Sequence, residues 1–403
     1  MTIPAVMLMS DAPSAYRLIG GLPLVTRHIK ELYKLGVREF YLCGVVQVPL
    51  AIQSACVPVD ARLYAVPCTQ DEIPRRLRSL PEALGDVLFV RGDCLVDPRL
   101  LAELLTRISP HYLPAPQATA GTLPAAARLS HAQLDTWATA GLDQWLQSSP
   151  VLKPESLDDY SPSHRGSVPF YVRTVTTREE AEVATRTLIR AAQKRALDLP
   201  ALLLDPIFEN RLVFWLCNTR ITPNQVTVFT GILGAYIALL FLHGWLRFGI
   251  TLAYAVEVLD GVDGKLARTR LQTSRLGELE HVLDFFMEHA WYLTVTIFLA
   301  TSTNDTQWWW VGGGLMASDL LDNLLYYAGH IWLGKQLDEL GPFDRSFRLI
   351  AGRCNIYAWM WLFVFWAGLP TYAFTAALAW AMVTVGVHSV RLAYHVRRRM
   401  AVA

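Results

Sequence analysis

Residues 221–246 read ITPNQVTVFTGILGAYIALLFLHGWL and contain no Asp, Glu, Lys or Arg. A helix needs about 20 apolar residues to cross the hydrocarbon core of a bilayer, so this stretch predicts a membrane-spanning helix. On its N-terminal side, up to about residue 200, charged residues and prolines interrupt short apolar runs, as in a soluble domain. On its C-terminal side, long apolar segments recur. The stretch therefore marks the start of a membrane half.

Six helices are predicted after residue 221, because six largely apolar segments are separated by short polar or Gly-Pro breaks. They cover about residues 223–243, 246–266, 278–300, 307–332, 354–369 and 372–395. If all six cross the bilayer and the N-terminal half is cytoplasmic, the outer loops receive only Arg247. The inner side receives Arg211, Arg220, Lys265, Arg268, Arg270, Arg275, Lys335, Arg345, Arg348, Arg353 and Arg397 to Arg399. This asymmetry follows the positive-inside rule. The sequence thus predicts an integral, multi-pass membrane protein.

Composition excludes several classes of protein. Hydrophobic residues make up 53% of the 403 residues and charged residues 18%, which rules out a disordered chain and exceeds the apolar content of an ordinary soluble enzyme. A net charge of +1 argues against a nucleic-acid partner held by bulk positive charge. The six cysteines form no CxxC pair, so we expect neither a zinc site nor a disulfide framework.

We expect three regions. Residues 1–195 form a cytoplasmic α/β domain, since the N-terminus lacks the basic and long apolar stretches of a signal peptide. Residues 222–403 form an all-α membrane domain. Between them, residues 196–221 mix apolar and basic residues at roughly helical spacing. This segment is either an interfacial helix on the cytoplasmic leaflet or a linker helix packed on protein, and the sequence leaves both readings open.

Acidic residues concentrate in residues 256–289, VEVLDGVDGKLARTRLQTSRLGELEHVLDFFMEH. Asp260 and Asp263 lie three apart, so on a helix they face the same side. Further acids recur four apart on the next predicted helix, at Glu280, Asp284 and Glu288. A single acid here is explained equally well by a helix cap or a salt bridge. Packed carboxylates repel unless cations neutralise them, and oxygen-only ligands favour Mg²⁺ or Mn²⁺ over zinc.

The same stretch resembles the CDP-alcohol phosphotransferase (CDP-alcohol phosphatidyltransferase) family, whose signature is D-x2-D-G-x2-A-R-x8-G-x3-D-x3-D. The matching positions are Asp260, Asp263, Gly264, Ala267, Arg268 and Gly277. The tail departs from the signature, because literal spacing places its last two aspartates at His281 and Phe285. A gap one residue shorter places them at Glu280 and Asp284, which both supply carboxylates. We adopt that alignment, with His281 as the alternative third ligand.

A second resemblance lies at residues 222–227, TPNQVT, which is similar to the TPN-x-hydrophobic-T start of the family's first spanning helix. A structural explanation also exists, because Thr222 is a plausible N-cap with Pro223 at the first helical position. The resemblance implies a nucleotide-binding role for Asn224, at the cytoplasmic end of the membrane half.

The family resemblance implies a two-metal transfer of a phosphoryl-alcohol group from a CDP-alcohol to a hydroxyl acceptor, with release of CMP. Two Mg²⁺ or Mn²⁺ ions would be held by Asp260, Asp263, Glu280 and Asp284, and Asp284 would act as the general base. The nucleotide would contact Asn224, Gly264, Ala267, Arg268 and Gly277. The resemblance also suggests a homodimer formed through the spans.

The acceptor side is expected between the fourth and fifth spans. There, residues 341–357 contain Arg345, Arg348 and Arg353. Positive-inside anchoring explains these arginines as well as a pocket for an anionic acceptor does. The stretch resembles enzymes that condense CDP-inositol with inositol phosphate, so inositol phosphate or a lipid is the expected acceptor. Asp319 and Asp322 on the fourth span are candidates to pair with the arginines or line the pocket.

The N-terminal region alternates predicted strands, at residues 5–9, 39–43 and 87–91, with a predicted helix at 23–35. This pattern predicts an α/β domain with a mainly parallel sheet. The order resembles sugar nucleotidyltransferases, and the fusion resembles inositol-phosphate cytidylyltransferases joined to a phosphotransferase. The chemistry-bearing parts are eroded, since SDAPSAYR at 10–17 has no glycine to wrap a triphosphate.

One metal aspartate of such a domain is matched by Asp93, whereas the position of the second holds Thr176. We therefore expect a degenerate domain with a binding or scaffolding role. Two alternatives remain. One is a bifunctional enzyme whose N-terminal domain still makes the CDP-alcohol from CTP. The other is a transporter or lipid-binding protein that uses the acids for ion coupling, although such carriers usually place their sites at the membrane midplane.

Overall fold

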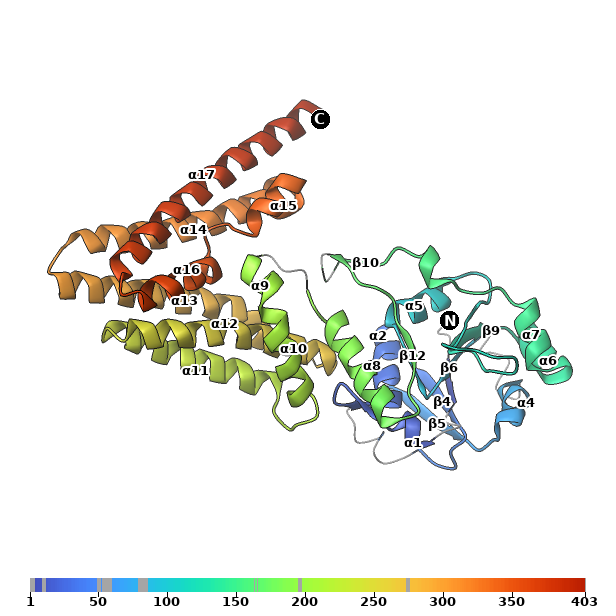
Figure 1. Cartoon of the computed structure of the whole chain (residues 1–403). Coiled ribbons are helices and arrows are strands. Elements are labelled where there is room, and N and C mark those ends of the chain that lie inside the picture. Colours follow the sequence, from blue (N-terminus) through green and yellow to red (C-terminus); the bar gives the residue numbers. More distant parts are fainter. Residues whose placement is uncertain are drawn as a thin grey trace. The chain divides into compact units, whose positions relative to one another are not determined.

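The computed structural model describes residues 4–8, 12–48, 52, 60–78, 86–162, 164, 166–194, 198–272 and 276–402. The chain divides into two compact units (Figure 1). The first comprises Met1–Lys194 with the short pieces Cys217–Thr219 and Thr269–Leu271. The second comprises Arg195–Leu216, Arg220–Arg268 and Gln272–Ala403. The first unit is α/β and the second is helical, as the change of composition near residue 200 predicts.

A six-stranded sheet forms the centre of the first unit. Its order is β5 (Arg62–Val66), β4 (Glu39–Cys43), β1 (Ala5–Leu8), β6 (Val87–Arg91), β9 (Ala126–Leu129) and β8 (Tyr112–Leu113). The first four strands pair in parallel, which confirms the prediction of a mainly parallel sheet. β9 pairs with β6 in the antiparallel direction, and β8 pairs with β9 in the antiparallel direction. Strand residues such as Met7, Phe40 and Leu88 are fully buried, because helices cover the sheet on both faces.

Helices of the first unit follow from apolar periodicity and caps. α2 (Leu24–Lys34) buries Val25, Ile29 and Leu32 at a spacing of four and three residues, and it confirms the helix predicted at 23–35. Asp97 caps α5 (Pro98–Thr106) by accepting a bond from the Arg99 amide. The remaining longer helices are α4 (Ile73–Arg78), α6 (His131–Ala140), α7 (Leu142–Ser148) and α8 (Arg178–Ala191).

Long helices build the second unit, and they occupy the six predicted segments. They are α11 (Pro223–Leu242), α12 (Leu246–Thr269), α13 (Leu276–Thr303), α14 (Gln307–Leu333), α16 (Cys354–Trp366) and α17 (Pro370–Val402). Within the described residues, three segments are long and apolar enough to cross a membrane, namely Pro223–Leu242, Val282–Thr303 and Pro370–Ala401. α16 is apolar but shorter. The helix positions are therefore confirmed, and three of the six expected spans meet this criterion.

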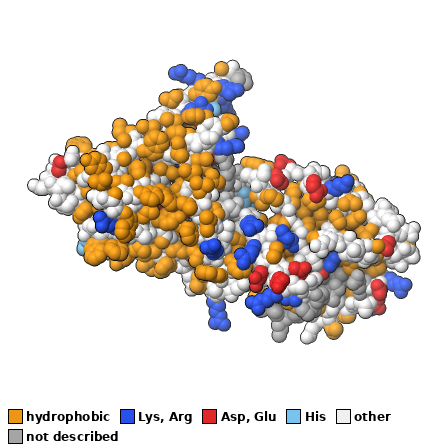
Figure 2. Space-filling view, in the orientation of Figure 1, with side chains coloured by type: hydrophobic (Ala, Val, Ile, Leu, Met, Phe, Trp, Pro, Cys, Tyr) orange, Lys and Arg blue, Asp and Glu red, His pale blue; other side chains and the backbone are white. Residues whose placement is uncertain are grey.

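Aromatic side chains fill the core of the helical unit. Trp291, Tyr292, Tyr357 and Trp361 are almost fully buried, and the indole of Trp291 donates to the Gly234 carbonyl at 2.8 Å. The outside of the unit is also apolar, and Figure 2 shows hydrophobic side chains over most of the face in view. Exposed apolar residues of α11 include Val228, Phe229, Ile232, Tyr236 and Leu239. A surface this apolar is unusual for a protein surrounded by water and typical of one surrounded by lipid.

Two helices precede the first candidate span, α9 (Leu199–Leu203) and α10 (Asp205–Leu216). α10 turns its polar side inward, since Asp205 and Glu209 are buried. Burial, reinforced by the Glu209 carboxylate, raises the pKa of Asp205 to about 6. Its opposite side exposes Ile207, Phe208 and Trp215. The helix is thus packed on protein through one face, and its other face exposes these apolar residues together with Arg211.

Candidate functional site

The two aspartates of DGVDG lie on α12, which is a continuous helix from Leu246 to Thr269. Asp260 and Asp263 therefore share one face one turn apart, as their spacing predicts. Asp263 is 3% exposed and Asp260 is half-buried. Burying a carboxylate costs free energy unless hydrogen-bond donors or cations compensate its charge. This face of α12 is therefore a candidate cation-binding site.

The glycines beside these aspartates have different surroundings. A Cβ atom on Gly261 would lie 2.0 Å from Oε1 of Glu209, so the missing side chain makes room for α10. A Cβ atom on Gly264 would meet only the guanidinium of Arg268 as its nearest neighbours, with Nη1 at 3.2 Å. The absence of a Cβ at Gly261 thus leaves space for the Glu209 side chain of α10. At Gly264 the neighbour is one flexible side chain.

Thr227 joins α11 to this face. Its hydroxyl donates to Oδ2 of Asp263 at 2.5 Å, across 36 residues of sequence. The start of α11 is fixed by a capping box, in which the Thr222 hydroxyl accepts from the Gln225 amide and the Gln225 side chain accepts from the Thr222 amide. The predicted N-cap at Thr222 is confirmed. Asn224 is exposed at this helix end.

The acids of the next helix are described only in part. α13 is helical from Leu276, but the side chains of residues 276–281 lie outside the description, and these include Gly277, Glu280 and His281. Asp284 and Glu288 are half-buried, and electrostatic interactions connect both of them with Glu257 of α12. Among the side chains that the structure describes, no three of His, Cys, Asp and Glu form a metal-binding group.

Sequence reasoning did not anticipate the role of Lys265. It occupies a variable position of the motif, and its ammonium forms a 2.5 Å ion pair with Oε2 of Glu209 and donates to Asn210 at 2.9 Å. Lys265 is 1% exposed and Glu209 is 6% exposed. The available signal was Glu209 itself, the single acid in the run PIFENRLVFWL at 206–216. Ala267 and Arg268 follow half-buried on the same helix.

The three candidate acceptor arginines have different environments. Arg345 is exposed in α15 (Pro342–Arg348), whereas Arg348, at the end of that helix, is 6% exposed. Arg353 donates to Oδ1 of Asn323 at 3.1 Å and lies 3.8 Å from Oδ2 of Asp322. The expected pairing of an arginine with Asp322 is confirmed, and Nδ1 of His388 lies 2.5 Å from the other carboxylate oxygen.

Tyr326 brings two of these arginines together. The guanidinium groups of Arg348 and Arg353 lie 6.0 Å and 5.8 Å from the centre of its ring. Two cations at one aromatic ring repel each other, and nearby acids such as Asp322 offset part of that repulsion. An additional anion beside the two cations would be favourable for the same reason.

In the first unit, the residues expected to match a nucleotidyltransferase site are engaged in structural contacts. The Arg91 guanidinium donates two hydrogen bonds, of 2.9 Å and 2.6 Å, to the Asp93 carboxylate. Arg17 donates to the carbonyl of Thr176 at 2.6 Å. The amide and hydroxyl of Thr176 both donate to Glu180, in the capping box that begins α8. Thr176, at the position expected for a second aspartate, therefore lies next to the Thr177 cap and binds its partner Glu180.

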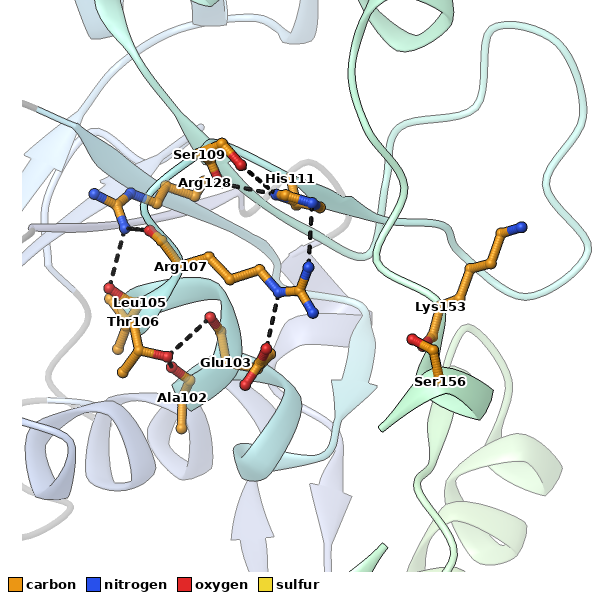
Figure 3. Close-up of polar contacts among 10 residues, drawn as sticks. All are labelled: Ala102, Glu103, Leu105, Thr106, Arg107, Ser109, His111, Arg128, Lys153 and Ser156. Atoms are coloured by element: carbon orange, nitrogen blue, oxygen red, sulfur yellow. Dashed lines mark hydrogen bonds and ion pairs between the residues drawn. The ribbon is translucent and has the colours of Figure 1, made fainter. Parts of the chain in front are cut away.

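A basic group on α5 and the strands beside it is also structural (Figure 3). Arg107 bonds Oε1 of Glu103 at 2.8 Å and the His111 ring at 3.2 Å. Arg128 pairs with Asp86 at 2.8 Å and donates to the carbonyls of Leu105 and Arg107, where α5 ends. Arg128 thus satisfies the last carbonyls of a helix, and Arg107 is engaged by Glu103 and His111, so we assign neither arginine a ligand.

Comparison with known proteins bears on the helical unit. Residues 220–387 match the CDP-alcohol phosphatidyltransferase family. The chain is similar to a protein of Thermococcus kodakarensis named bifunctional IPC transferase and DIPP synthase, with 32% identity over 180 residues that cover 42% of this chain and 40% of the relative. A protein of the same name from Aquifex aeolicus is 30% identical over 141 residues, which cover 34% of this chain and 32% of the relative.

These matches span less than half the length of either relative. Among solved structures, HddC from Yersinia pseudotuberculosis aligns with 46% of this chain and 98% of its own, at 13% identity and a TM-score of 0.31, which is too weak to support an argument. The resemblance to the CDP-alcohol family, inferred from the signature at 260–277, is confirmed by the match over residues 220–387.

Proposed function

We propose that this protein transfers a phosphoryl-alcohol group from a CDP-alcohol to an acceptor hydroxyl and releases CMP. In this reaction the acceptor oxygen forms a bond to the β-phosphorus, the bond from that phosphorus to the CMP oxygen breaks, and the hydroxyl proton leaves. The observation that carries the proposal is the pair Asp260 and Asp263 on one face of α12, within the segment that matches the CDP-alcohol phosphatidyltransferase family.

The donor set fits a hard divalent cation. The candidate ligands Asp260, Asp263, Glu280 and Asp284 are all carboxylates, the chemistry that Mg²⁺ and Mn²⁺ prefer. A pair of such ions would offset the negative charge of the diphosphate and of the departing CMP. Asp284 is proposed to accept the proton of the attacking hydroxyl. Asp284 is half-buried on α13, and electrostatic interactions link it with Glu257 and Glu288.

Gly264 and Arg268 are proposed to receive the nucleotide. The absence of a Cβ at Gly264 leaves the helix surface accessible up to the Arg268 guanidinium, which suits a phosphate bound by charge-assisted hydrogen bonds. Ala267, one turn further along α12, has a small side chain and also leaves space for the nucleotide. Asn224, exposed at the start of α11, is proposed to contact the nucleotide as well, and the family resemblance adds Gly277.

An anionic acceptor is proposed to bind near Tyr326, where Arg348 and Arg353 both approach the ring. Arg345 is exposed and suits an outer contact or an anchor to lipid headgroups. The names of the relatives favour inositol phosphate over a lipid as the acceptor, since the family resemblance links these enzymes to inositol phosphates. The acceptor is thus proposed to be a phosphorylated polyol.

The first unit is proposed to bind or scaffold without transferring a nucleotide. The name of the relatives includes a transferase activity besides the synthase, which keeps a bifunctional enzyme as the alternative. The Arg91 grip on Asp93 argues against that alternative, because a carboxylate already held by a cation is a poor metal ligand. Pyrophosphate release from CTP and inositol phosphate by the full chain would establish the bifunctional form.

A six-span, cytoplasm-facing arrangement is proposed for the helical unit. The positive-inside asymmetry supports the orientation. The exposed apolar face of α10, with Ile207, Phe208 and Trp215 opposite its buried acids, supports an interfacial position on the same leaflet. A homodimer through the spans is proposed on the family resemblance alone.

CMP release from a panel of CDP-alcohols, in detergent or liposomes, tests the proposal. We expect release that requires Mg²⁺ or Mn²⁺ and an acceptor, and that stops when the metal is chelated. Inositol phosphate and lipid acceptors are compared in parallel arms. If no CDP-alcohol yields CMP while the protein moves ions or lipids across liposomes, the transporter alternative replaces the enzyme.

A further inference from the structure

The hydroxyl of Thr227 has two acceptors within reach. Oδ2 of Asp263 lies at 2.5 Å, and the carbonyl of Pro223, one turn back on α11, lies at 3.2 Å. A hydroxyl has a single proton to donate. Hydrogen bonds to a carboxylate are shorter and stronger than bonds to a neutral carbonyl. The Thr227 proton therefore belongs to the bond with Asp263, which crosses from α11 to α12.

We propose that Thr227 is a positioning residue that holds the Asp263 carboxylate in the orientation required for a divalent cation. This inference rests on the proposed function. Asp263 is 3% exposed, so its carboxylate depends on protein groups for its orientation. A donor fixed on Oδ2 restricts rotation of the carboxylate and supports its negative charge, as groups behind metal ligands commonly do.

The position of Thr227 relative to the start of α11 is determined by the sequence. The capping box between Thr222 and Gln225 and the proline at the first helical position set where the helix begins. Thr227 then falls four residues after Pro223, on the turn that faces Asp263. The TPN-x-hydrophobic-T stretch and the aspartate motif thus meet at one hydrogen bond. A helix cap alone explains Thr222 but leaves Thr227 without a reason.

Thr230, on the same helix, provides a matched control. Its hydroxyl donates to the Val226 carbonyl four residues back, at 2.9 Å, and the residue is 5% exposed. This is the ordinary bond of a helical threonine. A threonine-to-valine change at either position removes one hydroxyl at nearly constant volume, so the two variants differ chiefly in whether a bond to an acid is lost.

Mn²⁺ binding to the full-length protein in detergent, followed by the electron paramagnetic resonance signal of free Mn²⁺ without substrate, tests the inference. We expect Thr227→Val to weaken Mn²⁺ binding by about 10-fold to 100-fold, the usual effect of removing a group behind a metal ligand. Thr227→Ser, which keeps the hydroxyl, should bind within a few-fold of the wild type. Thr230→Val should bind as the wild type does. Thr227→Ala replaces the valine variant if that variant fails to fold.

Three results overturn the inference. The first is unchanged Mn²⁺ binding in Thr227→Val, and the second is a serine variant as weak as the valine variant. The third is equal weakening by Thr230→Val, which would indicate a general disturbance of α11. In each of these the wild type still binds Mn²⁺ and the proposed function stands. A wild type that neither binds Mn²⁺ nor releases CMP removes the proposed function instead, and the inference with it.

Discussion

The carboxylate of Glu209 and the ammonium of Lys265 form an ion pair of 2.5 Å in which both residues are buried. Glu209 belongs to α10 and Lys265 to α12, two residues after Asp263. The ion pair connects α10, which precedes the first candidate span, with α12, which carries the candidate metal ligands Asp260 and Asp263. Because both residues are buried, separating the two charges would leave each without its counter-charge.

Removal of one member of this pair should destabilise the helical unit strongly. Glu209→Met or Lys265→Met alone leaves a buried charge without its counter-charge, which typically costs about 3–5 kcal/mol. The double substitution replaces both charges with apolar groups and should cost much less than the two single changes together. Thermal unfolding of the four proteins in one detergent measures the coupling.

The exposed pair Arg178 and Glu182 on α8 is the control for this cycle, because both side chains are largely in solvent. Its two single substitutions to methionine should show little coupling, since surface pairs contribute little to stability. Additive effects at Glu209 and Lys265 would contradict the conclusion that the buried pair acts as a unit.

Gly261→Ala should displace α10 from α12. The added methyl group would lie 2.0 Å from Oε1 of Glu209, an approach that no real Cβ atom makes. We expect a lower thermal midpoint and reduced CMP release, because the Glu209 carboxylate must move and its buried pair with Lys265 is disturbed. Gly313→Ala on α14 is the matched control, because nothing lies within 4 Å of its Cβ position. Equal loss in both variants would show that helix glycines matter here for a different reason.

Periodicity and composition predicted much of this fold. The apolar segments located all six long helices to within a few residues at most ends, because burial in lipid and in a helix core leaves a continuous apolar signal. The antiparallel strands β9 and β8 were not predicted. They are two to four residues long, and β9 contains small residues such as Ala126 and Ala127. The alternation of apolar and polar residues is therefore too short to predict a strand.

The sequence predicted which residues belong to the candidate site, but not the contacts between them. The signature located Asp260, Asp263 and Gly264 on one helix, since spacing along a helix determines which residues share a face. The bonds from Thr227 to Asp263 and from Lys265 to Glu209 join residues tens of positions apart. No local pattern encodes such pairs, because they depend on how the helices pack.

Asp284→Asn should abolish CMP release and leave CDP-alcohol binding largely intact. The amide keeps the size and a metal-ligating oxygen of the carboxylate but does not accept a proton from the acceptor hydroxyl. Turnover and binding of a CDP-alcohol are measured on the same preparation. Glu288→Gln, one turn further along α13, is the control and should lower turnover less. Wild-type turnover in Asp284→Asn would remove Asp284 from the role of base.

The stability of the first unit should depend on the ionisation of Glu31. This residue of α2 is 5% exposed and lies 3.6 Å from Nη1 of Arg27. Burial raises the pKa of Glu31 from its ordinary 4.5 to about 7, and the positive charges of Arg27 and Lys34 only partly oppose that shift. Between about pH 4.5 and 7, the folded domain therefore retains a proton that the unfolded chain has released. The stability that this proton contributes is complete below pH 4.5 and is lost as the pH rises through 7.

Glu31→Gln should accordingly become more stable relative to the wild type as the pH rises from 5 to 8, by about 3 kcal/mol for a pKa shift of this size. His28 acts in the opposite sense, because burial lowers its pKa to about 4 and acid then favours the unfolded chain. Nδ1 of His28 lies 3.9 Å from Oε2 of Glu31, so the comparison is made only above pH 5, where His28 is neutral in the folded domain because its pKa is about 4. Calorimetry of the full chain at both pH values measures the difference between variant and wild type. Glu103→Gln, which breaks the partly exposed pair with Arg107 drawn in Figure 3, should show no such dependence. A Glu31→Gln difference that is constant with pH would mean that Glu31 is already ionised in the folded domain at pH 5.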